Sequence, residues 1–203
     1  LFTLKDTSSK ILTGERVGYC HNCRADFSRN SYIKSTETAS SGTKATWGNV
    51  FQCADVWVCP VCHKKIVYER GCEISRAVDA HVTKGKAVSM FTFTIPHRHD
   101  DKLDYLLKKL ADARKRFFGD RVMRQVFELY RIIGHIDGLE VTHGRNGWHP
   151  HYHTLIIFNR KLTDDERLFC EKKLISAWLK ACATVIDRDN LNPHDLMPES
   201  DYI

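Results

Sequence analysis

The sequence predicts an α+β fold in which an antiparallel sheet carries helices on one face. Beyond position 86 the apolar spacing follows the order strand, helix, strand, strand, helix, which is typical of α+β rather than doubly wound proteins. In addition, Asn146-Gly147 separates two strand-like stretches, and this dipeptide is a strong short-range signal for a β-hairpin. A hairpin joins antiparallel strands.

The individual elements follow from apolar periodicity and end signals. Thr163 with Glu166 forms a predicted capping box for the last helix, whose inward side chains we expect to be Leu168, Phe169, Leu174, Ile175, Trp178 and Leu179. Gly71 is a predicted interruption of the first long helix. The expected strands are 87–95, 131–142 and 148–158, and the expected helices are 64–82, 100–118, 121–130 and 164–183.

Composition is that of a soluble globular protein, which we expect to lie in the cytoplasm. The 203 residues are 42% apolar and 28% charged, with no apolar run of the roughly 18–20 residues that a membrane span needs and no secretory signal. The net charge of +6 favours polyanionic partners only weakly. We expect a module at 1–82, a domain at 83–203, and, because the chain opens on Leu1 and stops at Ile203, a piece of a longer protein.

Three histidines alternate along one predicted strand. His149, His151 and His153 therefore face the same side. With Asn146-Gly147 as a two-residue turn, Glu140 lies opposite His153 and Thr142 lies opposite His151. Imidazoles beside a carboxylate suit a divalent metal with positions open for substrate. The alternative is a structural or pH-sensitive histidine cluster.

Five of the eight cysteines lie between positions 20 and 62. In a reducing cytosol such clustering favours metal binding over disulfides, and paired C-x2-C spacing indicates structural zinc. Four of the five are expected to bind, and the symmetry of the two pairs favours Cys23 over Cys53. The alternative is free or redox-active thiols. The five candidates are Cys20, Cys23, Cys53, Cys59 and Cys62.

Two segments carry a specific resemblance. Residues 134–142 with 146–156 (GHIDGLEVT and NGWHPHYHTLI) and residues 53–62 (CADVWVCPVC) resemble the plasmid rolling-circle Rep family of the His-hydrophobic-His (HUH) endonucleases. The strand 91–97 (FTFTIPH) resembles the first motif of that family. The resemblance covers roughly 16–203 and implies the HUH endonuclease fold, which is ferredoxin-like or RRM-like, behind an N-terminal zinc-ribbon-like module.

The same resemblance assigns the metal ligands. His151 and His153 match the metal-binding histidines of the family, Glu140 matches its carboxylate, and His149 belongs to the same signature without a settled role. The implied metal is Mg²⁺ or Mn²⁺. The family pattern for the structural zinc is Cys20, Cys53, Cys59 and Cys62, so it differs from the set that pair symmetry favours.

The implied reaction is a transesterification at a plasmid-type origin. A tyrosine attacks a phosphate of single-stranded DNA, keeps the 5′ phosphate and frees a 3′ hydroxyl. The family carries this tyrosine on a helix after the histidine strand, with a lysine following. Tyr202 is the one tyrosine after that strand here, and no lysine follows it. Glu199 or Asp201 would activate water for hydrolysis. The alternative for Tyr202 is a side chain that only packs.

The expected partners are single-stranded or melted origin DNA and host replication proteins, with no membrane. Predicted DNA contacts are Trp148, Arg145, Lys108, Arg114 and Arg121. The alternative for Lys108, Arg114 and Arg121 is a solvated helix face, and the alternative for Trp148 is a buried ring.

Other functions share parts of this pattern. A histidine-triad nucleotide hydrolase also has three alternating histidines, but Glu140 and the 53–62 segment argue against it. A non-catalytic nucleic-acid-binding module would have closed tetrahedral metal coordination instead of open positions. A relaxase or transposase would use the same chemistry as the Rep proteins.

Overall fold

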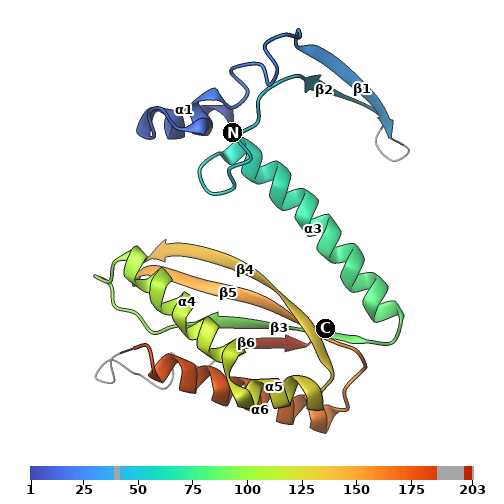
Figure 1. Ribbon diagram of the computed structural model, residues 1–203, viewed down its shortest axis with the longest axis vertical. Coiled ribbons are helices and arrows are strands. Elements are labelled where there is room, and N and C mark those ends of the chain that lie inside the picture. The colour runs from blue at the N-terminus through green and yellow to red at the C-terminus, as the bar shows by residue number, and fades with distance from the viewer. Residues whose placement is uncertain (39–41, 187–198, 203) are drawn as a thin grey trace. The chain divides into compact units, whose positions relative to one another are not determined.

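The computed structural model describes residues 1–38, 42–186 and 199–202 (Figure 1). The chain forms two compact units, Leu1–Ala77 and Val78–Ile203. The long helix α3 (Pro60–Thr83) begins in the first unit and ends in the second. No helix in the described ranges combines the length and apolarity needed to cross a membrane.

The first unit has little regular structure apart from α3. Two short helices, α1 (Phe2–Ile11) and α2 (Arg16–Tyr19), precede a two-stranded antiparallel sheet of β1 (Tyr32–Thr38) and β2 (Gly42–Gly48). Its buried core is Val17 with four cysteines. Such a core is too small to stabilise the unit by apolar burial alone, which is the situation in which a structural metal contributes folding free energy.

Helix α3 is longer than predicted. It begins at Pro60 instead of position 64 and continues through Gly71 without a break. Proline is favoured in the first turn of a helix because its missing N–H has no partner there in any case. Within the second unit, the ring of His81 hydrogen-bonds through Nε2 to the carbonyl oxygen of Phe158 at 2.7 Å, which fixes the last turns of α3 to a strand.

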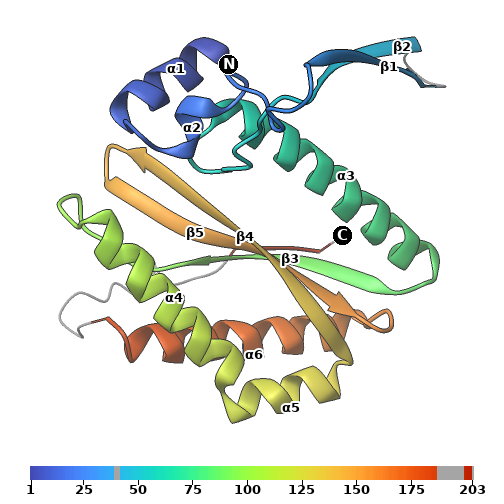
Figure 2. The same ribbon diagram turned by 45° about the horizontal axis from the view of Figure 1, so that its top comes forward.

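The second unit is a four-stranded antiparallel sheet with helices on one face, as predicted. Figures 1 and 2 show α4, α5 and α6 together on one side of this sheet. The strand order is β4-β5-β3-β6. The elements are β3 (Ala87–Thr94), α4 (Leu103–Gly119), α5 (Arg121–Leu129), β4 (Ile132–Gly144), β5 (Gly147–Phe158), α6 (Asp164–Ala183) and β6 (Glu199–Tyr202).

Alternate residues of β3 and β5 form the core with the helices. Phe93 lies at the centre, with ring centroids 4.7 Å from Trp178 of α6 and 5.0 Å from Phe117 of α4. Trp178 also donates from Nε1 to the carbonyl oxygen of Thr94 at 2.9 Å. Aromatic contacts of this kind stabilise by about 0.5–1.5 kcal/mol beyond the burial itself, so β3 is held firmly against α6.

Helix α6 confirms its predicted capping box. The hydroxyl of Thr163 accepts from the Glu166 amide at 3.2 Å, and the Glu166 carboxylate accepts from the Thr163 amide at 3.0 Å. The predicted inward face is correct at Leu174 and Trp178 but wrong at Leu168 and Phe169, which are exposed. The buried stripe instead follows the spacing of Cys170, Leu174, Trp178 and Ala181, which places 168 and 169 outside it.

Candidate functional site

Two histidines and a glutamate converge on the sheet face opposite the helices. The Nε2 atoms of His151 and His153 lie 3.2 Å apart. One carboxylate oxygen of Glu140 lies 3.3 Å from the first and 3.1 Å from the second. The three ligand atoms thus lie close enough together to hold one metal ion.

The strand register that produces this cluster differs from the predicted one. Glu140 is paired with His151 rather than His153, and Thr142 is paired with His149 rather than His151. The turn consists of Arg145 and Asn146, not Asn146 and Gly147. Because this moves the pairing by two residues, and side chains alternate with a period of two, Glu140 remains on the histidine face and still reaches both rings.

Gly147 explains why the turn is displaced. It has a φ of 84° and is the first residue of β5, whereas Arg145 and Asn146 do not take positive φ. This is the pattern of a type I turn followed by a left-handed glycine. A Cβ on Gly147 would also lie 2.5 Å from the carbonyl oxygen of His99. Both the conformation and the close approach therefore require glycine.

The second nitrogen of each clustered imidazole has its own contact. The Nδ1 atom of His153 lies 3.1 Å from the hydroxyl of Thr92, the residue of β3 with which His153 is paired. The Nδ1 atom of His151 lies 3.2 Å from the carbonyl oxygen of His149. Such contacts fix ring orientation and tautomer at metal sites, and here they leave both Nε2 atoms directed at Glu140.

His149 lies outside this group although it shares the strand and the face. Its Nδ1 atom is 2.9 Å from Nε2 of His97. Burial, followed by the charges of His151 and His97, lowers the pKa of His149. Within the described ranges, Nδ1 of His97 is buried and has no hydrogen-bond partner. His149 thus contacts His97 and is not one of the three residues whose ligand atoms converge, which are Glu140, His151 and His153.

A cleft of about 650 Å³ lies over the histidines. His151 is buried, but the Glu140 side chain is 52% exposed, so one side of the three-ligand group is open. Two imidazole nitrogens and a carboxylate oxygen are a donor set suited to a divalent first-row ion, and the open side leaves room for a phosphate oxygen. The cleft is lined by Thr92, Thr94, Ile95, Pro96, His97, His99, Asn146, His149, His151 and His153.

Four thiols of the first unit also converge. The sulfur of Cys20 lies 3.5 Å from that of Cys62 and 3.7 Å from that of Cys59, and the sulfurs of Cys53 and Cys62 lie 3.7 Å apart. Tetrahedral zinc with bonds of about 2.3 Å separates its sulfur ligands by about 3.8 Å. These four buried thiols therefore fit a zinc ion closely.

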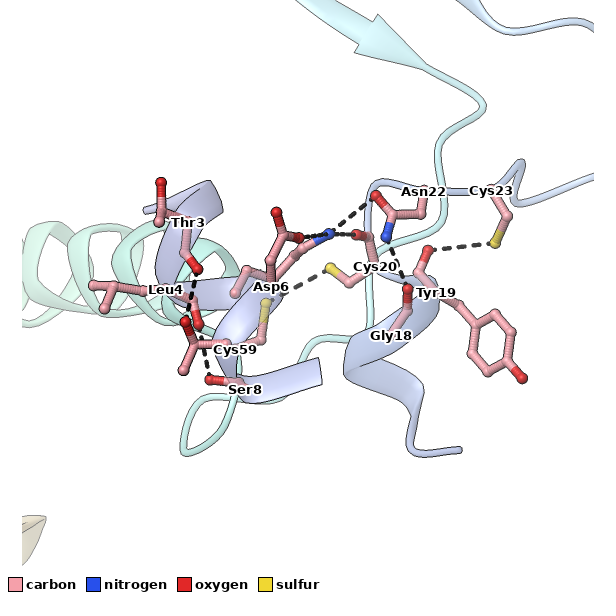
Figure 3. Close-up of polar contacts among 12 residues, drawn as sticks. Thr3, Leu4, Asp6, Ser8, Gly18, Tyr19, Cys20, Asn22, Cys23 and Cys59 are labelled. Atoms are coloured by element: carbon pink, nitrogen blue, oxygen red, sulfur yellow. Dashed lines mark hydrogen bonds and ion pairs between the residues drawn. The ribbon is translucent and has the colours of Figure 1, made fainter. Parts of the chain in front are cut away.

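Cys23 does not join the four thiols. Its sulfur lies 3.4 Å from the carbonyl oxygen of Tyr19, and Figure 3 shows it beside Tyr19 and separate from the sulfurs of Cys20 and Cys59. The structure thus assembles the set that the family pattern implied, with Cys53, and not the set that pair symmetry favoured. Zinc itself and the zinc-ribbon description of this module remain predictions.

A buried lysine contacts the backbone of one of the four cysteines. Lys5 is 1% exposed, and its ammonium donates to the carbonyl oxygen of Cys20 at 3.1 Å and to the side chain of Asn22 at 3.0 Å. The carboxylate of Asp6 lies 3.2 Å away (Figure 3). Four thiolates around a divalent cation would carry a net negative charge, which a nearby buried ammonium offsets.

The thiols differ in their electrostatic surroundings. Burial raises the pKa of Cys20 and of Cys53. Burial also acts upward at Cys59, but the backbone amide of Cys62 and the neighbouring thiols lower its pKa below the usual value. Zinc would require all four as thiolates, so binding would release protons from the two raised thiols.

The predicted nucleophile and water-activating residue lie in β6. Glu199–Tyr202 is a strand, not part of the helix that the family pattern implies. In the pairing of β6 with β3, Glu199 is aligned with Thr92 and Tyr202 with Ser89. Glu199 is therefore in register with the residue whose hydroxyl contacts His153.

The predicted DNA contacts are scattered, and one of them has a structural role. Arg114 forms an ion pair with Asp137 and lies over the rings of Phe118 and Tyr152. Asp137 is paired with Thr154, whose buried side faces the helices, so Arg114 is on the face opposite the histidines. The structure thus gives Arg114 a contact within the protein, and its expected role in DNA binding stays a prediction.

The other predicted contacts are exposed. Arg145 is exposed in the hairpin turn, and Trp148 is 36% exposed with its ring 4.5 Å from that of His143. Lys108 is exposed on α4 and Arg121 on α5. Only Arg145 and Trp148 belong to the hairpin that carries the histidines.

Sequence reasoning missed Thr92, His97, His99 and Asn146 as parts of the cleft. Thr92 and His97 belong to the segment that resembled the first family motif, and this was the available signal. Their roles depend on the pairing of β3 with β5 and on the loop after β3, neither of which the spacing of residues reveals.

The fold and site define a class: an α+β protein with an open histidine–carboxylate group on its sheet and a tetrathiol group in a separate unit. Comparison with known proteins then identifies the family. A family model described as "Replication protein" matches residues 48–190, and the chain belongs to this family. That agrees with the resemblance drawn from the sequence motifs.

Two curated relatives come from Streptomyces. The chain is 30% identical over 155 residues to "Protein rep" of Streptomyces lividans, an alignment that covers 63% of this chain and 34% of the relative. It is 31% identical over 133 residues to "Neomycin resistance protein" of Streptomyces cyanogenus, covering 53% of this chain and 30% of the relative. The chain thus spans about a third of these relatives. No solved structure matches it significantly.

The cysteine geometry predicts which thiols hold zinc. Cys53→Ser should lose most of the bound zinc and lower the melting temperature, because it removes one of four converging ligands. Cys23→Ser should keep about one zinc ion per chain. Elemental analysis with a thermal melt measures both effects. Loss of zinc in Cys23→Ser, with retention in Cys53→Ser, would favour the set based on pair symmetry.

The histidine geometry predicts the ligands of the second metal. Glu140→Gln and His151→Ala should each weaken Mn²⁺ binding by at least about tenfold, because each removes a ligand atom. His149→Ala should have a smaller effect. Electron paramagnetic resonance of free Mn²⁺ measures the affinity, and Glu128→Gln, an exposed carboxylate of α5, is the control. An equal loss in His149→Ala and His151→Ala would contradict the arrangement.

Proposed function

We propose that this chain is the DNA-cleaving part of a replication initiator, which nicks and rejoins single-stranded DNA at a plasmid-type origin. The observation that carries the proposal is the convergence of Glu140, His151 and His153 on an open sheet face in a member of the replication protein family. The HUH endonuclease fold is part of the same proposal and is supported by the antiparallel sheet with helices on one face.

Glu140, His151 and His153 would hold Mg²⁺ or Mn²⁺ in this proposal. When bound, such an ion polarises a phosphate oxygen and offsets the charge that develops there. The protein contributes ring orientation, because Thr92 and the His149 carbonyl group contact the remaining nitrogens. The cleft beside the rings supplies space for a phosphate with its flanking nucleotides.

Tyr202 is the proposed nucleophile. Its phenolate oxygen attacks the scissile phosphorus, a new O–P bond forms, and the bond from phosphorus to the 3′ oxygen breaks. The 3′ oxygen takes up a proton and becomes the free hydroxyl, while the 5′ phosphate stays on the tyrosine. Attack by a 3′ hydroxyl reverses the step and rejoins the strand. The resemblance to the Rep family supports this role, whereas the pairing of β6 with β3 does not, because it aligns Tyr202 with Ser89 on the helix side of the sheet.

Glu199 is the proposed base for hydrolysis of the phosphotyrosine. It would accept a proton from the attacking water. Its alignment with Thr92, which contacts His153, supports a position near the reacting phosphate. Arg145 and Trp148 are the proposed DNA contacts of the hairpin, through a phosphate and an unpaired base respectively.

The cellular setting is also part of the proposal. A free 3′ hydroxyl needs a polymerase to extend it, so host replication proteins in the cytoplasm are the expected partners. The histidine-triad hydrolase is disfavoured, because His149 contacts His97 and a glutamate contacts the other two rings.

A covalent-adduct assay tests the reaction. The protein is incubated with labelled single-stranded DNA from the origin of its own replicon, with Mn²⁺ or with EDTA, and resolved on a denaturing gel. An adduct should form in the presence of Mn²⁺ and should not form in the presence of EDTA. Tyr202→Phe and the double variant His151→Ala/His153→Ala should lower its yield by more than about a hundredfold.

The control is Tyr105→Phe, an exposed tyrosine of α4, which should form the adduct normally. An adduct that survives in Tyr202→Phe would assign the nucleophile elsewhere and keep the reaction class. DNA binding with no cleavage, in a longer chain as well as in this one, would contradict the enzymatic proposal and favour a binding module.

A further inference from the structure

The first unit carries a groove of about 1080 Å³ that neither metal site uses. Residues of β2 and the first turns of α3 contribute to its lining. Trp47 of β2 is 63% exposed and Tyr68 of α3 is 72% exposed. Single exposed aromatic side chains are ordinary, but Trp47 and Tyr68 line the same groove, and apolar groups gathered in this way mark a candidate binding surface.

Lysines accompany these rings. Lys64 and Lys65 also line the groove, and Lys64 precedes Tyr68 by one helical turn. The ammonium group of Lys65 donates to the side chain of Gln52 at 3.2 Å, which holds it at the groove. Glu69 is the one carboxylate among the lining residues. Aromatic faces and positive charges therefore occupy the same surface.

The net charge of the whole first unit also favours a polyanionic ligand. Residues 1–77 hold eleven lysines and arginines against seven aspartates and glutamates, a net charge of +4 out of the +6 of the chain. The second unit, which contains the histidine cleft, holds the remaining +2. The positive charge is thus concentrated in the unit with the exposed aromatic rings, where it complements a polyanion.

We propose that this groove binds single-stranded DNA without sequence preference. Unpaired bases stack on Trp47 and Tyr68, and the ammonium groups of Lys64 and Lys65 contact the phosphates. The inference rests on the proposed function in one respect, namely that the DNA handled by this protein is single-stranded. Duplex DNA is excluded as the main ligand because its paired bases offer no free faces to the two rings.

The test measures binding of a fluorescein-labelled oligothymidylate to the full chain by anisotropy, over a series of salt concentrations. Trp47→Ala and Tyr68→Ala should each weaken binding by about five- to tenfold, through the loss of one stacked base. Lys64→Gln/Lys65→Gln should weaken binding and also reduce the slope of log affinity against log salt by about 1.4, since about 0.7 counterions are released per phosphate on single strands.

Trp57→Ala is the matched control, because Trp57 is 69% exposed in the same unit but does not line the groove. It should bind as the unaltered protein does. Zinc content and melting temperature confirm that each variant is folded. Equal affinities for Trp47→Ala and Trp57→Ala, or an unchanged salt slope in the lysine variant, would overturn the proposal, as would preferential binding of a duplex.

The adduct assay separates this inference from the proposed reaction. Tyr202→Phe should bind oligothymidylate normally although it forms no adduct. If the chain forms the adduct normally but the groove variants bind the oligothymidylate as the unaltered protein does, the groove proposal fails and the proposed reaction stands. If the groove variants weaken binding but the unaltered chain forms no adduct, the proposed reaction fails and the groove proposal stands.

Discussion

The antiparallel pairing of β4 with β5 is the constraint on which the site depends. Directly opposed residues of such a pair bring their Cβ atoms within about 4.5–5.5 Å, so the pairing of Glu140 with His151 places a carboxylate beside an imidazole. His153 follows two residues later on the same face. A shift of the register by one residue would send Glu140 to the helix side and leave the histidines without a carboxylate.

β3 connects the hydrophobic core to this site. Its odd-numbered residue Phe93 packs against Trp178 and Phe117, while the even-numbered Thr92 contacts His153 on the other face. Because interiors are close-packed, the position of β3 is set by the helices, and the orientation of the His153 ring follows from it. Stability and site geometry therefore depend on the same strand.

Much of this arrangement was predictable because it depends on local periodicity. The alternation of His149, His151 and His153 placed them on one face, and the Thr163–Glu166 box located the start of α6. The predicted register differs from the observed one by two residues, because the Asn146-Gly147 signal places the turn one residue too late, whereas Gly147 is needed at the close approach to His99.

Features that depend on tertiary contacts were not predictable. Spacing alone could not decide between Cys23 and Cys53, because the choice depends on how residues 53–59 fold back on Cys20. The ion pair of Arg114 with Asp137 joins a helix to a strand, and the contact of His97 with His149 joins a loop to a strand. The first unit, in turn, has so few apolar core residues that its four thiols make up most of its buried core.

A crystal structure of the Mn²⁺-loaded chain, with anomalous scattering to locate the ion, tests the central claim most directly. We predict an ion bound by the Nε2 atoms of His151 and His153 and by the Glu140 carboxylate, with remaining positions open to the cleft. An ion bound instead between His97 and His149, or one fully enclosed by four protein ligands, would contradict it.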